Sequence, residues 1–211
     1  MVHTTAQISG NKVTRVSFRN VPSFPYQQDC RTLIPGYGSV AFDLSFGGSF
    51  FAAVPVEQFG LDIDSKNAKA LAEIAMTLKK KINAEFLTQH PSKPIQGVDL
   101  VSLYHFDQAR RHLQSCVVFG LGQIDRSPCG TSTCAMTALL YHKGFIGLGE
   151  EFISESIIGT QFRAQAVEEL DFHGYRAVIP QVTGTGYVLG TQQFFIDERD
   201  PFCEGLTLQS F

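Results

Sequence analysis

Apolar and polar side chains alternate in short runs along much of the chain, which is the pattern of β-strands. Val13–Phe18 is predicted as a strand, and the two prolines within 20–25 break it. The range 40–54 is a long β-rich run that contains Gly47-Gly48, a pair that indicates a bend or the close approach of another backbone. Further strands are predicted at 98–104, 115–119, 151–157, 162–170, 175–180, 186–189 and 194–196.

Two segments follow the period of a helix instead. The first begins at a cap supplied by Asp64 or Ser65 and is stopped by Pro91. Its apolar side chains form one stripe, as in an outer amphipathic helix: Ala68, Leu71, Ile74, Ala75, Leu78, Ile82 and Phe86. The second helix is predicted at 131–143 and is apolar on nearly all sides, so it should be buried. The expected fold class is α+β, with a curved sheet wrapped around one buried helix and a second helix outside.

Composition limits the partners and the compartment. Apolar residues make up 44% and charged residues 18% of the 211 positions, which is typical of a globular chain. The net charge of −3 gives no electrostatic reason to expect a nucleic acid or an anionic membrane as partner. No apolar stretch is long enough to cross a bilayer, and residues 1–20 lack a signal-peptide pattern, so a cytoplasmic location is expected.

The five cysteines are odd in number and irregularly spaced, which predicts reduced thiols rather than a disulfide framework. No Cys-x-x-Cys pair or histidine cluster occurs, so no metal site is expected. Core packing is the usual role of a lone cysteine, and it is the interpretation for Cys30, Cys116, Cys134 and Cys203. The histidines are interpreted as structural or exposed, with His105 and His112 in or near a loop.

Cys129 differs from the other thiols, because it lies where a turn rich in Pro, Gly and Thr opens into the buried helix. Free backbone N–H groups and the positive end of the helix dipole favour a thiolate there, so a depressed pKa is expected. The N–H groups of Gly130, Thr131 and Ser132 could cradle a carboxylate. Asp125 could meet an ammonium group from the other side, or could simply cap the turn. Together these groups describe a site for the α-carbon of an amino acid.

The stretch Asp125-Arg-Ser-Pro-Cys-Gly-Thr131 resembles the second cysteine motif of the proline racemase and hydroxyproline epimerase family. Other segments resemble family signatures in the same order along the chain: Asn20–Phe24, Phe46–Phe51, Val117–Gly120, Glu155–Thr160 and Phe195–Phe202. The resemblance implies a fold similar to diaminopimelate epimerase, in which two domains each wrap a mostly antiparallel sheet around a helix. It also implies that one cysteine from each domain acts on the α-carbon, without pyridoxal phosphate, a metal or any other cofactor.

Carried over by position, the resemblance makes Cys129 one acid/base and Asp125 the ligand of the ring nitrogen. Gly130 and Thr131 would bind the substrate carboxylate, and Phe119 would help to wall the pocket. The substrate would be proline or a hydroxyproline. Ser132 departs from the family pattern, which usually has Gly-Thr-Gly-Thr after the cysteine.

A larger departure is that the first cysteine motif of the family, Met-Cys-Gly-His, is absent from this sequence. The resemblance therefore divides the chain into remnant strands of a first domain at 1–22, an epimerase-like domain at 23–190, and a tail at 191–211 that returns to the first domain. This chain would then supply one of two cysteines and would be inactive alone, with surfaces that favour homo-oligomers. The alternative is a non-catalytic remnant that binds a small amino acid or a partner protein.

Overall fold

The computed structural model describes residues 2–205, which form one mixed sheet of eleven strands, two α-helices and two short 3₁₀ helices. The strands are β1 (His3–Ser9), β2 (Lys12–Arg19), β3 (Phe24–Ile34), β4 (Gly38–Phe46), β5 (Phe50–Pro55), β6 (Leu100–Asp107), β7 (His112–Phe119), β8 (Gln123–Ile124), β9 (Phe152–Ser156), β10 (Gln161–Phe172) and β11 (Tyr175–Gly184). The helices are η1 (Val56–Phe59), η2 (Ser65–Asn67), α1 (Ala68–Glu85) and α2 (Gly130–His142).

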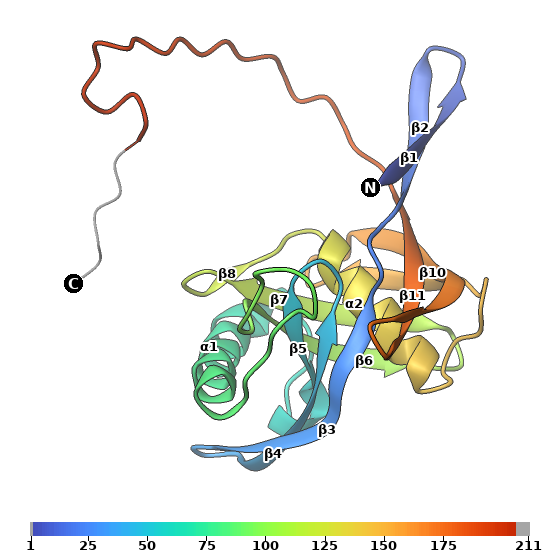
Figure 1. The fold of residues 1–211 in the computed structure, drawn as a ribbon, viewed down its shortest axis with the longest axis vertical. Helices are drawn as coiled ribbons and strands as arrows, with labels where there is room; N and C mark the ends of the chain where they lie inside the picture. Colours follow the sequence, from blue (N-terminus) through green and yellow to red (C-terminus); the bar gives the residue numbers. More distant parts are fainter. Residues whose placement is uncertain (1, 206–211) are drawn as a thin grey trace.

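The sheet curls around α2 until β3, at one end of the sheet, lies beside β11 (Figure 1). Its order is β1-β2-β11-β10-β9-β7-β6-β5-β4-β3, and only the pairs β5–β6 and β7–β9 are parallel. Near the start of β3, Ser23 and Val178 exchange backbone hydrogen bonds of 2.8 and 2.9 Å, which joins this end of the sheet to β11. The predicted α+β class and the curved, mostly antiparallel sheet are confirmed.

Helix α2 is buried as its composition predicts, since every residue from 132 to 140 is shielded from solvent. Gly47 and Gly48, between β4 and β5, let the backbone pass directly over the start of this helix. A Cβ atom at position 47 would overlap the carbonyl oxygen of Thr131 and the nitrogen of Ala135. The close approach predicted from the glycine pair is therefore confirmed.

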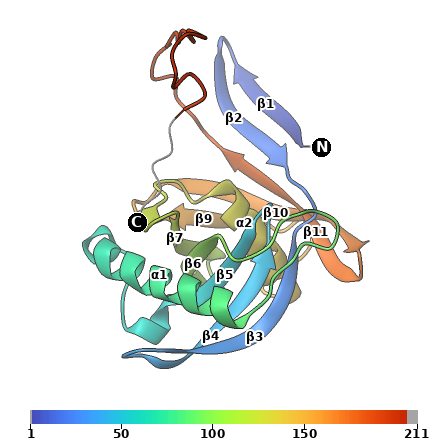
Figure 2. The same cartoon turned by 60° about the vertical axis from the view of Figure 1, so that its left-hand side comes forward.

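Helix α1 covers the outer face of β4–β7, so these strands are buried on both faces (Figure 2). Ala52 and Val54 of β5 face the core beneath α1, and Ala53 faces the core around α2. The stripe of α1 includes Leu71 and Leu78, which are fully buried and each contribute about 2 kcal/mol by leaving water. The prediction of an outer amphipathic helix is thus confirmed, since the apolar stripe of α1 packs on the core.

Strands β1 and β2 form a hairpin that projects from the body and joins the sheet through β11 (Figures 1 and 2). Beyond β11 the chain leaves the sheet, and the strands predicted at 186–189 and 194–196 are wrong, because no strand within residues 2–205 pairs with them. Their large apolar side chains, such as Leu189 and Phe195, are 98% and 85% exposed. The division of the chain at 22/23 and 190/191 stays a prediction.

Several predicted boundaries are also wrong. Helix α1 ends at Glu85, where the extended backbone of Phe86 interrupts it well before Pro91. Asp64 caps η2 by accepting the N–H of Lys66, rather than capping α1 directly. The histidines expected in or near a loop flank the turn between β6 and β7: His105 lies in β6 and forms an ion pair with Glu57 of η1, and His112 is the first residue of β7.

Candidate functional site

The loop from Asp125 to Cys129 is held in shape by hydrogen bonds between neighbouring residues. Asp125 Oδ1 accepts the backbone N–H of Ser127 at 2.8 Å and its hydroxyl at 3.0 Å. Ser127 Oγ in turn accepts the backbone N–H of Cys129 at 3.1 Å. This aspartate–serine turn connects β8 to the start of α2 and fixes the conformation of the loop between them.

Cys129 is the N-cap of α2 and has an unusual backbone, with φ of 62° and ψ of 114°. Its carbonyl accepts the first helical hydrogen bond, from Thr133 at 2.9 Å. A side chain in this region of the backbone map costs about 1–3 kcal/mol and persists only where the surroundings impose it. The strain lies at the residue that the sequence singled out as a catalytic candidate.

The Cys129 sulfur is more enclosed than the sequence suggests. The residue is 7% exposed and packs with Phe51, Val117 and Ala135. Burial raises the pKa of the thiol above its ordinary value, and the carboxylate of Asp125 adds to the rise. The N–H of Ser132 and the Thr131 hydroxyl, 3.6 Å from the sulfur, lower the pKa but do not cancel the rise. The expected depressed pKa is therefore wrong, because desolvation raises the pKa of Cys129 more than the hydrogen-bond donors at the helix start lower it.

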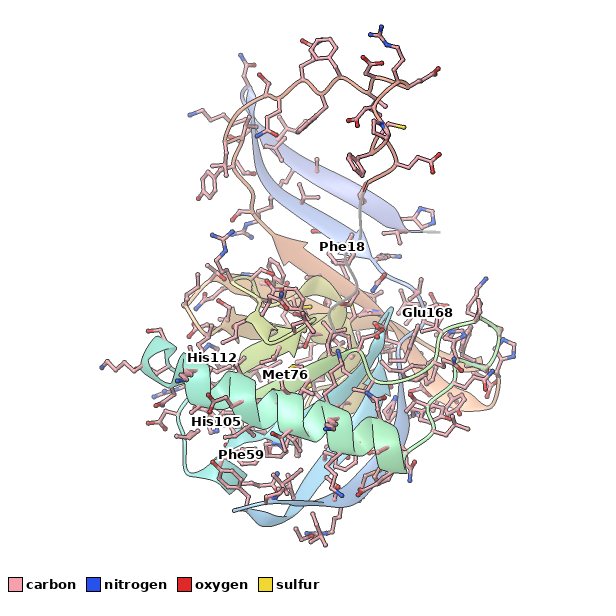
Figure 3. The ribbon with its side chains drawn as sticks, turned by 90° about the vertical axis from the view of Figure 1, so that its left-hand side faces the viewer. Phe18, Phe59, Met76, His105, His112 and Glu168 are labelled. Carbon is pink, nitrogen blue, oxygen red and sulfur yellow. The ribbon has the colours of Figure 1, made fainter. Side chains whose placement is uncertain are left out.

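The expected carboxylate cradle at Gly130 and Thr131 is partly covered. Phe18, at the base of the hairpin, lies between the hairpin and the body (Figure 3). Its ring stands 3.3 Å from the position that a Cβ atom of Gly130 would take. The backbone at Gly48 also passes close to Thr131, because a Cβ atom at position 48 would lie 3.0 Å from the Thr131 side chain. Because Gly130 has no side chain, the Phe18 ring can lie close to it, and no side chain of residue 130 covers the Gly130 N–H.

A hollow of about 770 Å³ opens beside this loop. Phe119 and Asp125 line it, as the carried-over roles require, and Phe119 is 38% exposed. Its remaining walls are formed by Ile124, Arg126, Ser127, Pro128, Ile158, Thr160, Gln161, Phe162, Thr185 and Tyr187. Cys129, Gly130 and Thr131 do not line it. The structure thus places Phe119 and Asp125 in the lining of one hollow and Asp125 near Cys129 in the loop, whereas the buried Cys129 does not contribute to that lining.

Three residues at the site were missed by sequence reasoning. Ser127 could have been found, because a serine two positions after an aspartate is a turn signal. Thr160, whose hydroxyl donates to the Arg126 carbonyl at 2.8 Å, and Phe18 come from distant segments. No local pattern in the sequence links either of them to Cys129.

Among residues 2–205, no three His, Cys, Asp or Glu side chains converge as metal ligands would. No helix in that range is both long and apolar enough to span a membrane.

Comparison with known proteins decides which family this site belongs to. The model of the family described as "Proline racemase" matches residues 1–207. The chain belongs to the proline racemase family. It is 45% identical over 200 residues to a proline racemase of Clostridioides difficile, covering 94% of this chain and 60% of that protein. It is 36% identical over 209 residues to a 4-hydroxyproline 2-epimerase of Streptosporangium roseum, covering 99% of this chain and 63% of that protein.

A solved structure from the same family has the same fold. A hydroxyproline epimerase from Agrobacterium vitis, determined with bound trans-4-hydroxy-L-proline, superposes with a TM-score of 0.90 at 37% identity. The match covers 98% of this chain and 60% of that one. The chain thus spans about 60% of the length of these racemase and epimerase relatives.

Proposed function

We propose that this chain supplies one of the two thiols of a cofactor-independent proline racemase or hydroxyproline epimerase. The observation that carries the proposal is the position of Cys129, a strained non-glycine residue at the start of a buried helix and next to Asp125. Membership of the proline racemase family supports the reaction class. The substrate is proline or a hydroxyproline, since the relatives carry both names.

In the proposed reaction, a thiolate removes the α-proton and an opposing thiol returns a proton to the other face. The C–H bond breaks, its electron pair is delocalised toward the substrate carboxylate, and a new C–H bond forms with inverted configuration. The raised pKa of Cys129 keeps it protonated near neutral pH, which suits the proton-donating half of this exchange. The Ser132 N–H and Thr131 hydroxyl on its sulfur would stabilise the thiolate in the opposite half.

The remaining contacts follow from the same assignment. Asp125 would bind the ring nitrogen, which is positively charged in free proline, and Phe119 would pack against the ring. The N–H groups of Gly130 and Thr131 would bind the carboxylate once Phe18 moves off Gly130.

A single thiol can serve only one face of the α-carbon, and this gives a sharp test. Cys134, the neighbouring thiol, is fully buried in the core. We expect this chain in heavy water to exchange the α-proton of one proline enantiomer for deuterium without inverting it. The exchange should rise between pH 7 and 10, because burial raises the pKa of Cys129 above its ordinary value and the thiolate fraction grows as the pH approaches that pKa.

Mass spectrometry measures the deuterium, and polarimetry measures inversion. Cys129→Ser should lose the exchange, whereas Cys30→Ser, a matched change at another buried thiol, should keep it. Equal rates for the wild type and Cys129→Ser would overturn the proposal and leave a non-catalytic binding role. Inversion at the rates of a complete racemase would instead show that the chain is not limited to one thiol.

A further inference from the structure

The turn between β9 and β10 lies against the loop from Asp125 to Cys129, although more than thirty residues separate them in the sequence. The Thr160 hydroxyl donates to the carbonyl oxygen of Arg126 at 2.8 Å. Arg126 is the residue between Asp125, which lines the hollow, and Ser127, which bonds the Cys129 N–H. Thr160 therefore holds the carbonyl of the residue that links Asp125 to Ser127.

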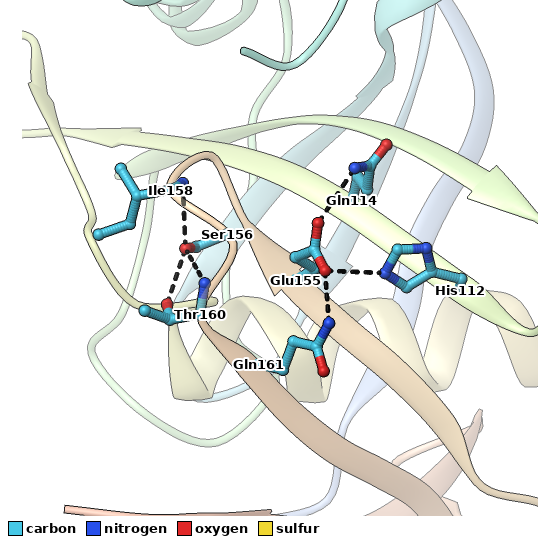
Figure 4. A network of polar contacts seen from close by, with 7 residues as sticks. All are labelled: His112, Gln114, Glu155, Ser156, Ile158, Thr160 and Gln161. Atoms are coloured by element: carbon cyan, nitrogen blue, oxygen red, sulfur yellow. Dashed lines mark hydrogen bonds and ion pairs between the residues drawn. The ribbon is translucent and has the colours of Figure 1, made fainter. Parts of the chain in front are cut away.

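The hydroxyl of Ser156 completes the contact (Figure 4). It lies 2.7 Å from the Thr160 hydroxyl and accepts the N–H of Thr160 at 3.2 Å and that of Ile158 at 3.4 Å. The single hydroxyl proton of Thr160 goes to Arg126, so Ser156 must donate in the bond that the two hydroxyls share. Each hydroxyl proton then has one acceptor, and the direction of the whole chain of bonds is fixed.

Glu155, next to Ser156, connects the same turn to side chains of β7 (Figure 4). Its carboxylate accepts from Gln161 at 2.5 Å and from Gln114 at 3.1 Å, and lies 3.3 Å from the ring nitrogen of His112. Burial alone would raise the pKa of Glu155, but these hydrogen bonds and the nearby histidine hold it below its ordinary value. The turn is thus tied to β7, and its Thr160 hydroxyl makes the hydrogen bond to the loop from Asp125 to Cys129.

We propose that Thr160 is a positioning residue, which orients Asp125 and Cys129 by holding the carbonyl of Arg126. The inference rests on the proposed function, in which Asp125 and Cys129 meet the substrate. Without the Thr160 hydroxyl, the Arg126 carbonyl would turn to water and the Asp125 carboxylate would shift relative to the Cys129 sulfur. Because Asp125 contributes to the raised pKa of that thiol, the change is visible in the reactivity of Cys129.

The test measures alkylation of Cys129 by iodoacetamide from pH 7 to 10, with the labelled peptide identified by mass spectrometry. Cys203 is exposed and would consume the reagent, so all variants carry Cys203→Ser. Thr160→Val, which keeps the shape but removes the hydroxyl, should change the rate by roughly 2- to 10-fold and shift the pH profile. Thr160→Ser should restore the wild-type profile.

Thr32→Val is the matched control, since it removes a threonine hydroxyl that bonds Glu85 at a site distant from the loop. Its profile should match the wild type. If the profile of Thr160→Val also superposes on the wild type, the positioning role is overturned. If Thr160→Val does not fold by circular dichroism, Ser156→Ala tests the same chain of bonds. A Ser156→Ala profile equal to the wild type would likewise overturn the role.

A separate arm tests the proposed function. Proline or pyrrole-2-carboxylate, a planar carboxylate of similar shape, should slow alkylation of wild-type Cys129. If neither ligand protects but Thr160→Val still shifts the profile, the proposed function fails and the positioning role stands. If ligands protect and Thr160→Val is silent, the positioning role fails alone.

Discussion

Cys129 combines a place at a helix start with a buried sulfur, and the two properties move its pKa in opposite directions. The N–H of Ser132 and the Thr131 hydroxyl stabilise the thiolate, as the sequence suggests for any thiol at a helix N-terminus. Packing against Phe51 and Val117 removes the water that a thiolate needs, and this effect is larger. A residue's pKa therefore depends on neighbours that its local sequence does not contain.

Gly47 is a second residue whose role depends on a distant segment, and it supports a prediction about stability. Gly47→Ala should lower the free energy of unfolding by about 2 kcal/mol or more, because its Cβ would overlap the backbone of α2 at Thr131 and Ala135. Urea denaturation measures the change. Gly186→Ala, where nothing lies near the added Cβ, should change stability by less than about 0.5 kcal/mol. Equal changes in stability for Gly47→Ala and Gly186→Ala would mean that the added Cβ at position 47 does not strain the contact with α2.

Gly47 and Gly48 show what can be predicted from the sequence for single residues. The glycine pair predicts the close approach of another backbone, but only the structure identifies α2 as the element that approaches. In the same way, Asp125 and Cys129 stand out from the sequence because their neighbours are turn formers. Thr160 and Phe18 do not stand out, since their contribution depends on which strands lie side by side.

At the scale of elements, side chains of β4 hold α2 at two places. In the middle of the helix, the Ser45 hydroxyl of β4 donates to the carbonyl of Ala135 at 2.9 Å. Just beyond its end, Lys143 Nζ lies 2.9 Å from Asp43 Oδ2, whose side chain is only 5% exposed. A buried carboxylate that keeps its partner is tolerated, whereas one that loses it is strongly destabilising.

Lys143→Met should therefore lower the free energy of unfolding by about 3 kcal/mol, because Asp43 would keep its burial and lose its counter-charge. Lys81→Met, which breaks an exposed ion pair with Glu85, should cost about 0.5 kcal/mol or less. Thermal and urea denaturation measure both changes. Adding Asp43→Asn to Lys143→Met should recover part of the loss. A double variant as unstable as the single one would contradict this account.

The segment between α1 and β6 carries a pH-dependent contact. His90 packs against Phe46 with ring centroids 4.7 Å apart, and its Nδ1 accepts the Ser92 N–H at 3.1 Å. Burial lowers the pKa of His90, and the nearby His173 and Lys93 lower it further. Near pH 6.5, His90 therefore binds a proton more readily in the unfolded chain than in the folded chain.

The sign of the effect follows from this proton balance. Below about pH 6.5 the unfolded state gains protons that the folded state does not, so the free energy of unfolding should fall as the pH falls. His90→Leu should remove this part of the pH dependence, and His3→Gln, at an exposed histidine in β1, should keep it. Urea denaturation at pH 5, 6 and 7 compares the three proteins. A His90→Leu profile parallel to the wild type would rule out this role.

Element boundaries show what periodicity can and cannot predict. The stripe of α1 and the apolar composition of α2 predict both helices, since each pattern reports burial directly. The ranges 186–189 and 194–196 have equally apolar sequences and yet form no strand. A strand needs a partner edge, and among the described residues none lies beside these two ranges.

At the scale of the whole molecule, the hairpin and the tail are apolar surfaces without a partner in residues 2–205. Ile8 and Val13 of the hairpin are 66% and 54% exposed, and Phe194, Phe195 and Ile196 of the tail are 79–85% exposed. The outer edge of β1 also leaves backbone hydrogen-bonding groups unpaired. Exposed apolar side chains and open strand edges together favour association.

We therefore expect this chain to self-associate, with an average mass in light scattering that rises with protein concentration. The triple variant Phe194→Ser, Phe195→Ser, Ile196→Ser should lower the mass at every concentration, because these side chains contribute exposed apolar area and nothing to the core. A matched triple change at polar positions of the same segment, Thr191→Ser, Gln192→Ser, Gln193→Ser, should leave the mass unchanged. The thermal stability of both variants should equal that of the wild type, which separates association from folding. A wild-type chain that stays monomeric at high concentration would contradict the expected self-association.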